Sequence, residues 1–304
     1  MYDIIIVGAG PAGLTAAIYA RRASKKVLVL EAKTYGGQII NTLDIENYPV
    51  EAHISGFDFA TKLYNQVKDL GAEIIYEKVV DIKDNHETKE VITTKNKYVA
   101  KALILATGSE NRKLGIENEN ELIGKGVSYC ATCDGAFYKK KNVAVVGGGN
   151  TALEDALYLT DIANKVYLIH RRDEFRGAES TLNQLKDKEN MEFIYNSNVT
   201  KLNANDKLQS IEITNKDGSK RIIEVEGLFI AVGRIPENEN FRKLIKLDNS
   251  GYIIAGEKCN TNVRGIFVAG DNRTKEVRQL VTATSDGAIA ATEAIKFINN
   301  EATY

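Results

Sequence analysis

The side chains best suited to chemistry in this sequence are two cysteines separated by two residues. Cys130 and Cys133 enclose Ala-Thr and are followed directly by Asp134. A Cys-x-x-Cys pair either forms a redox-active disulfide or supplies half of a zinc site. A zinc site needs two more ligands, and the remaining cysteine and three histidines form no second pair with metal-like spacing. The redox interpretation is therefore favoured.

A redox pair needs an electron source and a group that handles protons. Thiolates must be protonated as a dithiol forms, and Asp134 is placed to do this. The alternative is that Asp134 is a turn or cap residue before Gly135. Cys259 stands alone in the sequence, so we expect it to be structural or incidental.

An internal repeat indicates the electron source. The chain contains two copies of a glycine-rich segment. Each copy follows an apolar β-branched run and precedes a helical pattern and then a second strand. The key residues of each copy, separated by the same interval, are Gly8, Gly10 and Gly13 in the first and Gly147, Gly149 and Ala152 in the second. An isolated match of this kind can be an ordinary glycine-rich turn. Two matches in strand–turn–helix–strand context predict two dinucleotide-binding units.

Each glycine position in such a unit has a physical role. The first glycine permits a tight turn, the second lets a pyrophosphate approach the backbone, and the third position must be small for the helix to pack on the strand. The phosphates then bind the free N–H groups at the helix N-terminus.

The ends of the second strands differ in charge. The first ends at Glu31, whose carboxylate suits a ribose without a 2'-phosphate. The second ends at His170, Arg171 and Arg172, with Arg176 close behind. Paired guanidinium groups bind a 2'-phosphate through forked hydrogen bonds, so this unit is predicted to prefer NADPH. The alternative is a solvated basic patch.

The remaining pattern completes an α/β fold with two Rossmann-like, three-layer dinucleotide-binding domains. The further elements that we expect are helices over 57–70 and 278–298 and strands over 72–77, 102–106, 228–232 and 265–270. A length of 304 residues suits about two domains.

Composition excludes several classes of protein. The net charge of -1 argues against a nucleic-acid-binding or membrane-surface protein, since these usually carry a basic excess. No apolar stretch is long enough to span a bilayer, and the N-terminus begins directly with a strand pattern rather than a secretory signal. With few cysteines, the chain is expected to be cytoplasmic.

Taken in order, the motifs resemble the low-molecular-weight thioredoxin reductases, which are NADPH-dependent flavoprotein disulfide reductases. They are the two glycine units, Ala-Thr-Gly, Cys-Ala-Thr-Cys-Asp, His-Arg-Arg-x-x-x-Arg and a late Gly-Asp, and the resemblance runs over nearly the whole chain. It implies that electrons pass from NADPH through FAD and the Cys130–Cys133 disulfide to thioredoxin, in a homodimer. The alternative is a related enzyme that reduces another redoxin or a small disulfide.

The resemblance also implies a domain arrangement. The FAD domain would comprise 1–111 and 245–304, with an NADPH domain at 112–244 that carries the disulfide. Linkers would lie near 109–116 and 234–246. The inserted domain would rotate about them, because the nicotinamide and the disulfide must each approach the flavin closely.

The resemblance assigns residues to both cofactors. Those for FAD are Gly8, Gly10, Ala12, Gly13, Glu31, Gly37, Gln38, Asn47, Val80, Ala106, Thr107, Gly108, Gly270, Asp271, Arg278 and Gln279. Those for NADPH are Gly147, Gly149, Asn150, Thr151, His170, Arg171, Arg172 and Arg176. Cys133 would be the sulfur nearer the flavin, with Cys130 its partner.

Two positions depart from the family pattern. Two phenylalanines often follow Cys-Asp-Gly, whereas this chain has Ala136-Phe137, and an arginine often found before the cysteines is Lys125 here. These changes concern the choice of protein partner. A flavin-dependent NADPH–ferredoxin reductase of similar architecture is disfavoured because it needs no cysteine pair.

Replacing Arg171 and Arg172 by alanine tests the assignment of NADPH. We expect the Michaelis constant for NADPH to rise far more than that for NADH, because the lost contacts to a 2'-phosphate are worth on the order of 2–4 kcal/mol. Steady-state kinetics with both nucleotides measures this. Equal effects on the two nucleotides would contradict the assignment.

Overall fold

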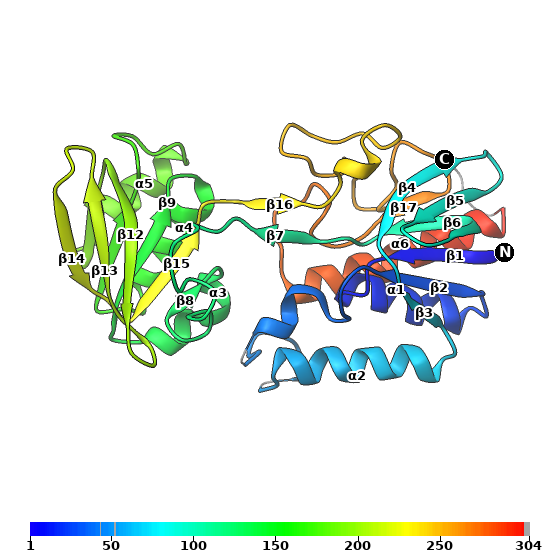
Figure 1. Ribbon diagram of the computed structural model, residues 1–304, viewed down its shortest axis with the longest axis horizontal. Helices are drawn as coiled ribbons and strands as arrows, with labels where there is room; N and C mark the ends of the chain where they lie inside the picture. The colour runs from blue at the N-terminus through cyan, green and yellow to red at the C-terminus, as the bar shows by residue number, and fades with distance from the viewer. Residues whose placement is uncertain (43, 52, 301–304) are drawn as a thin grey trace. The chain divides into compact units, whose positions relative to one another are not determined.

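The repeat folds into two strand–helix–strand units, as predicted (Figure 1). The computed structural model describes residues 1–42, 44–51 and 53–300. In each copy the two strands are parallel neighbours. The elements are β1 (Tyr2–Val7), α1 (Pro11–Arg22) and β2 (Val27–Glu31) in the first copy, and β9 (Asn142–Gly147), α4 (Asn150–Thr160) and β10 (Lys165–Ile169) in the second.

One unit of the chain is inserted into the other. Unit 1 comprises Met1–Glu110 and Ile235–Tyr304, and unit 2 comprises Asn111–Arg234. The chain returns to unit 1 at Ile235, whereas the boundary expected from the sequence lay between residues 244 and 245. The reason is that Phe241 and Ile245 are buried in the core of unit 1. The chain crosses through β7 (Ser109–Asn111) and β16 (Arg234–Pro236), which pair with each other.

Unit 1 is built on a sheet in which β1, β2, β3, β6 and β17 run parallel and β4 and β5 add an antiparallel hairpin. The strand order is β3-β2-β1-β6-β5-β4, with β17 also beside β6. The further elements of this unit are η1 (Gly37–Asn41), α2 (Gly56–Asp69), β3 (Glu73–Tyr76), β4 (Val79–Asp84), β5 (Lys89–Thr93), β6 (Lys97–Leu105), η3 (Glu239–Phe241), β17 (Ile266–Val268) and α6 (Leu280–Ile298).

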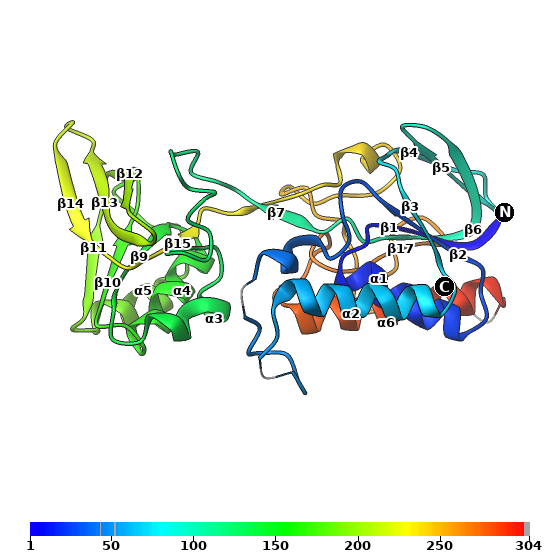
Figure 2. The same cartoon turned by 60° about the horizontal axis from the view of Figure 1, so that its bottom comes forward.

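Alternation along β1 separates the two cores of unit 1. Ile4 and Ile6 face α1, α2 and α6, which cover one face of the sheet (Figure 2). Ile5 and Val7 face the opposite side, where they pack with Phe241 and its neighbours. Because adjacent side chains of a strand point to opposite faces, a strand that is apolar throughout must be covered on both sides. Because α1 follows β1 after a short turn, the N-terminus of α1 lies at the carboxyl ends of the parallel strands.

Unit 2 has three layers. A parallel sheet, in the order β11-β10-β9-β15-β8, carries α4 and α5 on one face and an antiparallel sheet of β12, β13 and β14 on the other. The further elements are β8 (Val127–Ser128), α3 (Ala131–Asp134), η2 (Gly135–Tyr138), α5 (Glu179–Lys186), β11 (Met191–Ile194), β12 (Ser197–Ala204), β13 (Leu208–Asn215), β14 (Lys220–Glu224) and β15 (Gly227–Ala231).

The elements expected from the sequence match α2, α6, β3, β6, β15 and β17 to within a few residues at their ends. The hairpin β4–β5 and the strands β12–β14 were not among the expected elements. Register shifts interrupt the regular alternation in β4 and β12. No helix in the described part of the chain combines the length and apolar character that crossing a bilayer requires.

Candidate active site and cofactor sites

The glycine loop of unit 1 has space for a side-chain atom only at its middle glycine, Gly10. A Cβ on Gly8, whose φ is +108°, would lie 2.3 Å from the carbonyl oxygen of Ala106. A Cβ on Gly13 would lie 1.9 Å from the carbonyl oxygen of Gly8. At Gly10 the nearest heavy atom would be Cα of Gly37, at 3.9 Å. The loop therefore has the three roles expected of a phosphate-binding turn, with space left beside Gly10 at the start of α1.

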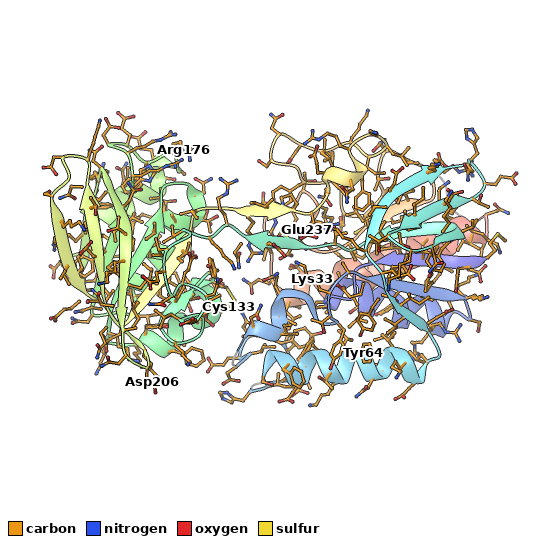
Figure 3. The ribbon with its side chains drawn as sticks, in the orientation of Figure 1. Lys33, Tyr64, Cys133, Arg176, Asp206 and Glu237 are labelled. Carbon is orange, nitrogen blue, oxygen red and sulfur yellow. A yellow bond between two sulfur atoms is a disulfide. The ribbon has the colours of Figure 1, made fainter. Side chains whose placement is uncertain are left out.

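A hollow of about 250 Å³ lies at the carboxyl ends of β1 and β2. Its lining includes Gly8, Glu31, Val79 and Thr107, together with the side chain of Glu237 that Figure 3 labels near Lys33. The Glu31 carboxylate accepts hydrogen bonds from the N–H of Ala9, at 2.7 Å, and of Lys33, at 2.8 Å. Glu31 thus fixes the turn after β1 and also faces the hollow.

The structure gathers most of the residues assigned to FAD around α1. Gly37 lies against Gly10, and Ala106 against Gly8. A Cβ on Gly270 would lie 2.9 Å from Cβ of Ala12. The amide of Asn47 donates to Oε1 of Gln279 at 3.3 Å. Gln38 follows Gly37 in η1, Gly108 follows Thr107 after β6, and Asp271 follows Gly270 after β17. Val80, by contrast, is 39% exposed, while its neighbour Val79 is buried and lines the hollow.

A buried ionic cluster that sequence reasoning missed holds the segment after β17. Asp286 of α6 accepts from the backbone N–H of Gly270 at 3.0 Å, from Lys275 Nζ at 2.9 Å and from both sides of the Arg273 guanidinium at 2.7 and 2.8 Å. These cations hold the pKa of Asp286 below its ordinary value despite burial. Arg278 donates to the carbonyl of Arg273 at 3.2 Å. Asp286 lies within a helical pattern, and nothing in the sequence around it indicated a buried ion pair.

The second glycine loop repeats the geometry of the first. A Cβ on Gly147 would lie 2.4 Å from the carbonyl oxygen of Ala231 and 2.6 Å from Cβ of Ala152, so Ala152 fills the third position. A Cβ on Gly149 would meet no atom within 4 Å. Asn150 begins α4, and its Oδ1 accepts from the N–H of Ala178 at 2.8 Å. The exposed Thr151 follows in the first turn.

The basic cluster lies beside this loop. The N–H of Arg176 donates to the carbonyl of Gly148 at 2.7 Å, which ties the segment to the glycine turn. Arg171, Arg172 and Arg176 are all exposed, and within residues 1–42, 44–51 and 53–300 they form no ion pair. Exposed guanidinium groups and a helix N-terminus are groups that favour binding of an anion.

His170 has a different role from the arginines. It is 4% exposed, its ring stacks on Phe175, and the ring lies 2.1 Å from the position that a Cβ on Gly148 would take. Burial, followed by Arg176 and Arg172, lowers its pKa, so the ring is neutral at pH 7. The ring of His170 therefore packs against the glycine loop, and its assignment to NADPH stays a prediction.

The cysteine pair is a disulfide at the start of α3, with an S–S distance of 2.07 Å (Figure 3). Both cysteines are partly exposed. α3 packs against α4. Directly after α3, a Cβ on Gly135 of η2 would lie 2.9 Å from the ring of Tyr158 in α4, so a larger side chain would not fit there. The segment that carries the redox pair therefore packs against α4, the helix that starts at the second glycine loop.

Carboxyl groups contact the segment of the disulfide from three sides. Asp134 accepts from Ser128 Oγ at 2.6 Å, and burial raises its pKa against the effect of this hydrogen bond. Asp155 of α4 accepts from the N–H of Ala131. Glu119, which is 2% exposed, accepts from the hydroxyl of Tyr129 at 2.6 Å. Asp155 and Glu119 were missed because neither is close to the cysteines in the sequence.

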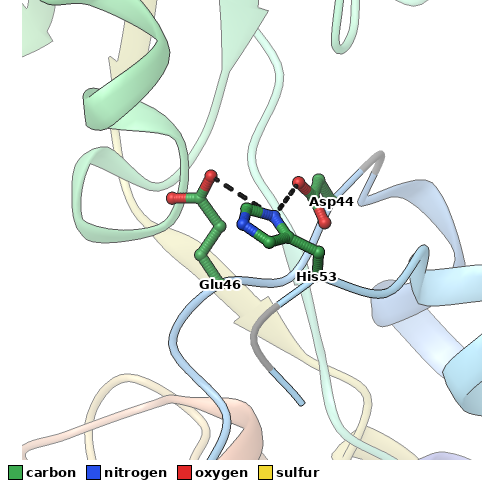
Figure 4. Close-up of side chains that lie close together, drawn as sticks. All are labelled: Asp44, Glu46 and His53. Carbon is green, nitrogen blue, oxygen red and sulfur yellow. Dashed lines mark hydrogen bonds and ion pairs between the residues drawn. The ribbon is translucent and has the colours of Figure 1, made fainter.

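A group of side chains that could surround a metal ion lies apart from the cysteines. Among the described residues, one group of three or more His, Cys, Asp and Glu side chains could surround a metal, and it consists of Asp44, Glu46 and His53 (Figure 4). His53 Nδ1 lies 2.9 Å from Asp44 and 3.9 Å from Glu46, and the hydrogen bond to Asp44 raises the pKa of His53. The histidine is exposed, as ordinary surface ion pairs are. Cys259 is fully buried, as expected for a structural cysteine, and burial raises its pKa to about 12.

Two glycines of the second loop form a matched test. We expect Gly149→Ala to fold like the wild type, because its Cβ meets open space and its φ is -100°. The methyl group should nevertheless weaken NADPH binding roughly tenfold or more by blocking the pyrophosphate. Gly147→Ala should instead lower stability by about 1–3 kcal/mol, since its Cβ would overlap Ala231. Thermal unfolding and NADPH titration separate the two; unchanged NADPH affinity of Gly149→Ala would rule out the phosphate site.

A second test concerns Asp155, whose pKa is raised to about 7 by burial and by Glu154, against the charge of Arg234. Its contribution to stability is full below about pH 4 and is lost as the pH rises through 7, because the folded protein favours the neutral acid. Going from pH 5 to pH 8, Asp155→Asn should gain stability relative to wild type, on the order of 2 kcal/mol. Urea unfolding at both pH values measures this. Asp161→Asn, at the exposed end of the same helix, is the control and should show no such change.

Comparison with known proteins agrees with this geometry. Residues 2–287 match the family described as "Pyridine nucleotide-disulphide oxidoreductase". The chain is 44% identical over 300 residues to a thioredoxin reductase of Listeria innocua serovar 6a, covering 98% of this chain and 94% of that protein. It is 42% identical over 293 residues to a thioredoxin reductase of Bacillus subtilis, covering 96% and 93%.

Solved structures give the same result. The crystal structure of thioredoxin reductase from Streptococcus pyogenes matches with a TM-score of 0.94 and 40% identity, covering 99% of both chains. Thioredoxin reductase from Giardia duodenalis matches with a TM-score of 0.93 and 37% identity, covering 98% of this chain and 99% of that one. The chain belongs to the pyridine nucleotide-disulphide oxidoreductase family.

Proposed function

We propose that this protein is a thioredoxin-disulfide reductase that passes electrons from NADPH through FAD and the Cys130–Cys133 disulfide to oxidised thioredoxin. The observation that carries the proposal is that the disulfide helix α3 packs against α4, the helix of a dinucleotide-binding loop. A second loop of the same geometry lies in unit 1. The names of the relatives at 42–44% identity support the same activity.

Unit 1 fits the adenosine and pyrophosphate of FAD. The space beside Gly10 would admit a phosphate to the first N–H groups of α1, and Glu31 faces the hollow at the strand ends. Gly37, Asn47, Asp271 and the other residues assigned above would hold the remainder. When bound, FAD supplies a carrier that accepts two electrons from a nicotinamide and gives them to a disulfide.

Unit 2 fits NADPH. The open position at Gly149 would admit the pyrophosphate to α4. Arg171, Arg172 and Arg176 would bind the 2'-phosphate, which carries more charge than one guanidinium can offset. Their exposure and freedom from ion pairs among the described residues leave them available for this contact.

The cysteines then transfer the electrons by thiol–disulfide exchange. Reduction of the Cys130–Cys133 bond takes two electrons and two protons and yields two thiols. One thiolate attacks the disulfide of thioredoxin to form a mixed disulfide, and the other attacks that bond, which releases reduced thioredoxin and restores the Cys130–Cys133 bond. Asp134, within the same turn, would give and take the protons of this exchange.

Features around α3 suit a protein partner. Phe137, three residues after Asp134, is 42% exposed and would contribute apolar contact area. A different redoxin or a small disulfide is the alternative oxidant, since Ala136 and Lys125 depart from the family pattern. A homodimeric, cytoplasmic enzyme is part of the proposal, as is the rotation of the inserted domain.

An insulin-coupled assay with several purified redoxins tests the function. With NADPH, the wild type should reduce thioredoxin in preference to other redoxins and to small disulfides. Cys130→Ser and Cys133→Ser should each lose this activity entirely, while NADPH still bleaches the flavin, because the hydride path to FAD needs no thiol.

The matched control is Cys259→Ser, which removes a buried thiol outside the proposed site. It should keep the rate of thioredoxin reduction per folded molecule. Continued reduction of a redoxin by the Cys133→Ser protein would show that the active site is elsewhere.

A further inference from the structure

Ser128 lies between Asp134 and the backbone of the first redox cysteine. It is 3% exposed at the end of β8. Its Oγ is 2.6 Å from Oδ2 of Asp134, 3.1 Å from the backbone N of Cys130 and 3.3 Å from the carbonyl oxygen of Cys130. All three contacts lie within the segment that carries the disulfide.

A hydroxyl has one hydrogen and two lone pairs, so it can donate one hydrogen bond and accept two. When Asp134 is ionised, its carboxylate and the carbonyl of Cys130 both need that one hydrogen. The N–H of Cys130 always donates to Ser128 Oγ. When Asp134 is ionised, the serine hydrogen points to its carboxylate, and the short distance marks a charge-assisted bond. When Asp134 is protonated, its own hydrogen can point to the second lone pair of Oγ, and the serine hydrogen can turn to the carbonyl of Cys130.

We propose that Ser128 is a positioning residue for proton transfer, because its hydroxyl can rotate to serve both protonation states of Asp134 without movement of any heavy atom. The proposal rests on the proposed function in one respect, that Asp134 exchanges protons with the cysteine pair. The same oxygen holds the backbone of Cys130, so the acid stays at a fixed place relative to the disulfide while its charge changes.

The bond to Ser128 also sets the range in which Asp134 titrates. Burial raises the pKa of Asp134 and the hydrogen bond from Ser128 lowers it. The other titratable groups nearby are the two cysteines, Tyr138 of η2, which feels the charge of Asp134, and Asp155 of α4, which holds the N–H of Ala131. Burial raises the pKa of Tyr138 to about 12, so it stays neutral near pH 7. Burial and Glu154 raise the pKa of Asp155 to about 7, so its titration must be distinguished from that of Asp134.

The test uses the complete protein, reduced with dithiothreitol, and follows the rate of cysteine alkylation by iodoacetamide from pH 4 to 9. Asp134→Asn and Asp155→Asn identify which inflection in the profile belongs to which carboxyl group. In Ser128→Ala we expect the Asp134 inflection to move up by about one pH unit, because the ionised acid loses its donor. Ser128→Thr, which keeps the hydroxyl, should restore the wild-type profile.

Two controls separate this role from packing. Ser197 is a buried serine of the same unit whose Oγ contacts Tyr195 and Asn215, so Ser197→Ala should leave the profile unchanged. Adding Ser128→Ala to Asp134→Asn should also change nothing further, since the acid on which the serine acts is gone. Ser128→Ala removes one oxygen and creates no clash; near-UV circular dichroism verifies the fold.

The proposal is overturned if Ser128→Ala leaves the Asp134 inflection in place, or if Asp134→Asn removes no inflection. It is also overturned if the Ser128 effect persists in the Asp134→Asn background. Because alkylation needs neither NADPH nor a redoxin, these outcomes are independent of whether the wild type reduces thioredoxin in the insulin-coupled assay.

Discussion

The structure depends on how closely two helices approach the strands that precede them. At Gly13 even a methyl group would lie 1.9 Å from the carbonyl oxygen of Gly8, so α1 can start where it does only because the side chain is a hydrogen. In the second copy the constraint moves to Gly147, whose missing Cβ leaves room for Ala152. This contact fixes each helix N-terminus at the carboxyl end of the parallel sheet, where unpaired N–H groups attract an anion. Both proposed cofactor sites follow from it.

Buried charges hold the segments that these helices position. Asp286 joins Gly270, Arg273 and Lys275, and side chains of this cluster are almost wholly buried. Removing one partner from such a cluster typically costs about 3–5 kcal/mol, because a charge remains in the interior without compensation. These contacts hold the segment that leads to Arg278 and Gln279, two residues that are proposed to contact FAD.

The surroundings of the disulfide combine burial with short hydrogen bonds. Burial drives both Asp134 and Asp155 toward the neutral acid. The hydrogen bond from Ser128 opposes this at Asp134, and the charge of Arg234 and the N–H of Ala131 oppose it at Asp155. The pKa of each carboxyl group is on balance raised above its ordinary value, to about 7 for Asp155. The chain just before Cys130 is held by Glu119, which accepts a hydrogen bond of 2.6 Å from the hydroxyl of Tyr129. The same carboxylate also accepts hydrogen bonds from the N–H groups of Leu114 and Gly115. The redox pair therefore lies beside carboxyl groups with raised pKa values, on a segment that several hydrogen bonds hold.

The sequence by itself determined the two dinucleotide-binding units, the redox interpretation of Cys130 and Cys133 and the contrast between Glu31 and the arginines at 171 and 172. These rest on local periodicity and on short motifs, in which chemistry and spacing occur together. Only the tertiary structure revealed Asp286, Asp155 and Ser128 as neighbours of those motifs, because their contacts join β17 to α6, α3 to α4, and β8 to the end of α3. It also decided that 235–244 belong to unit 1, since Phe241 is buried there. Hydrogen bonds and ion pairs between polar residues of distant segments leave no periodic trace in a sequence, and for this reason only the folded chain could show them.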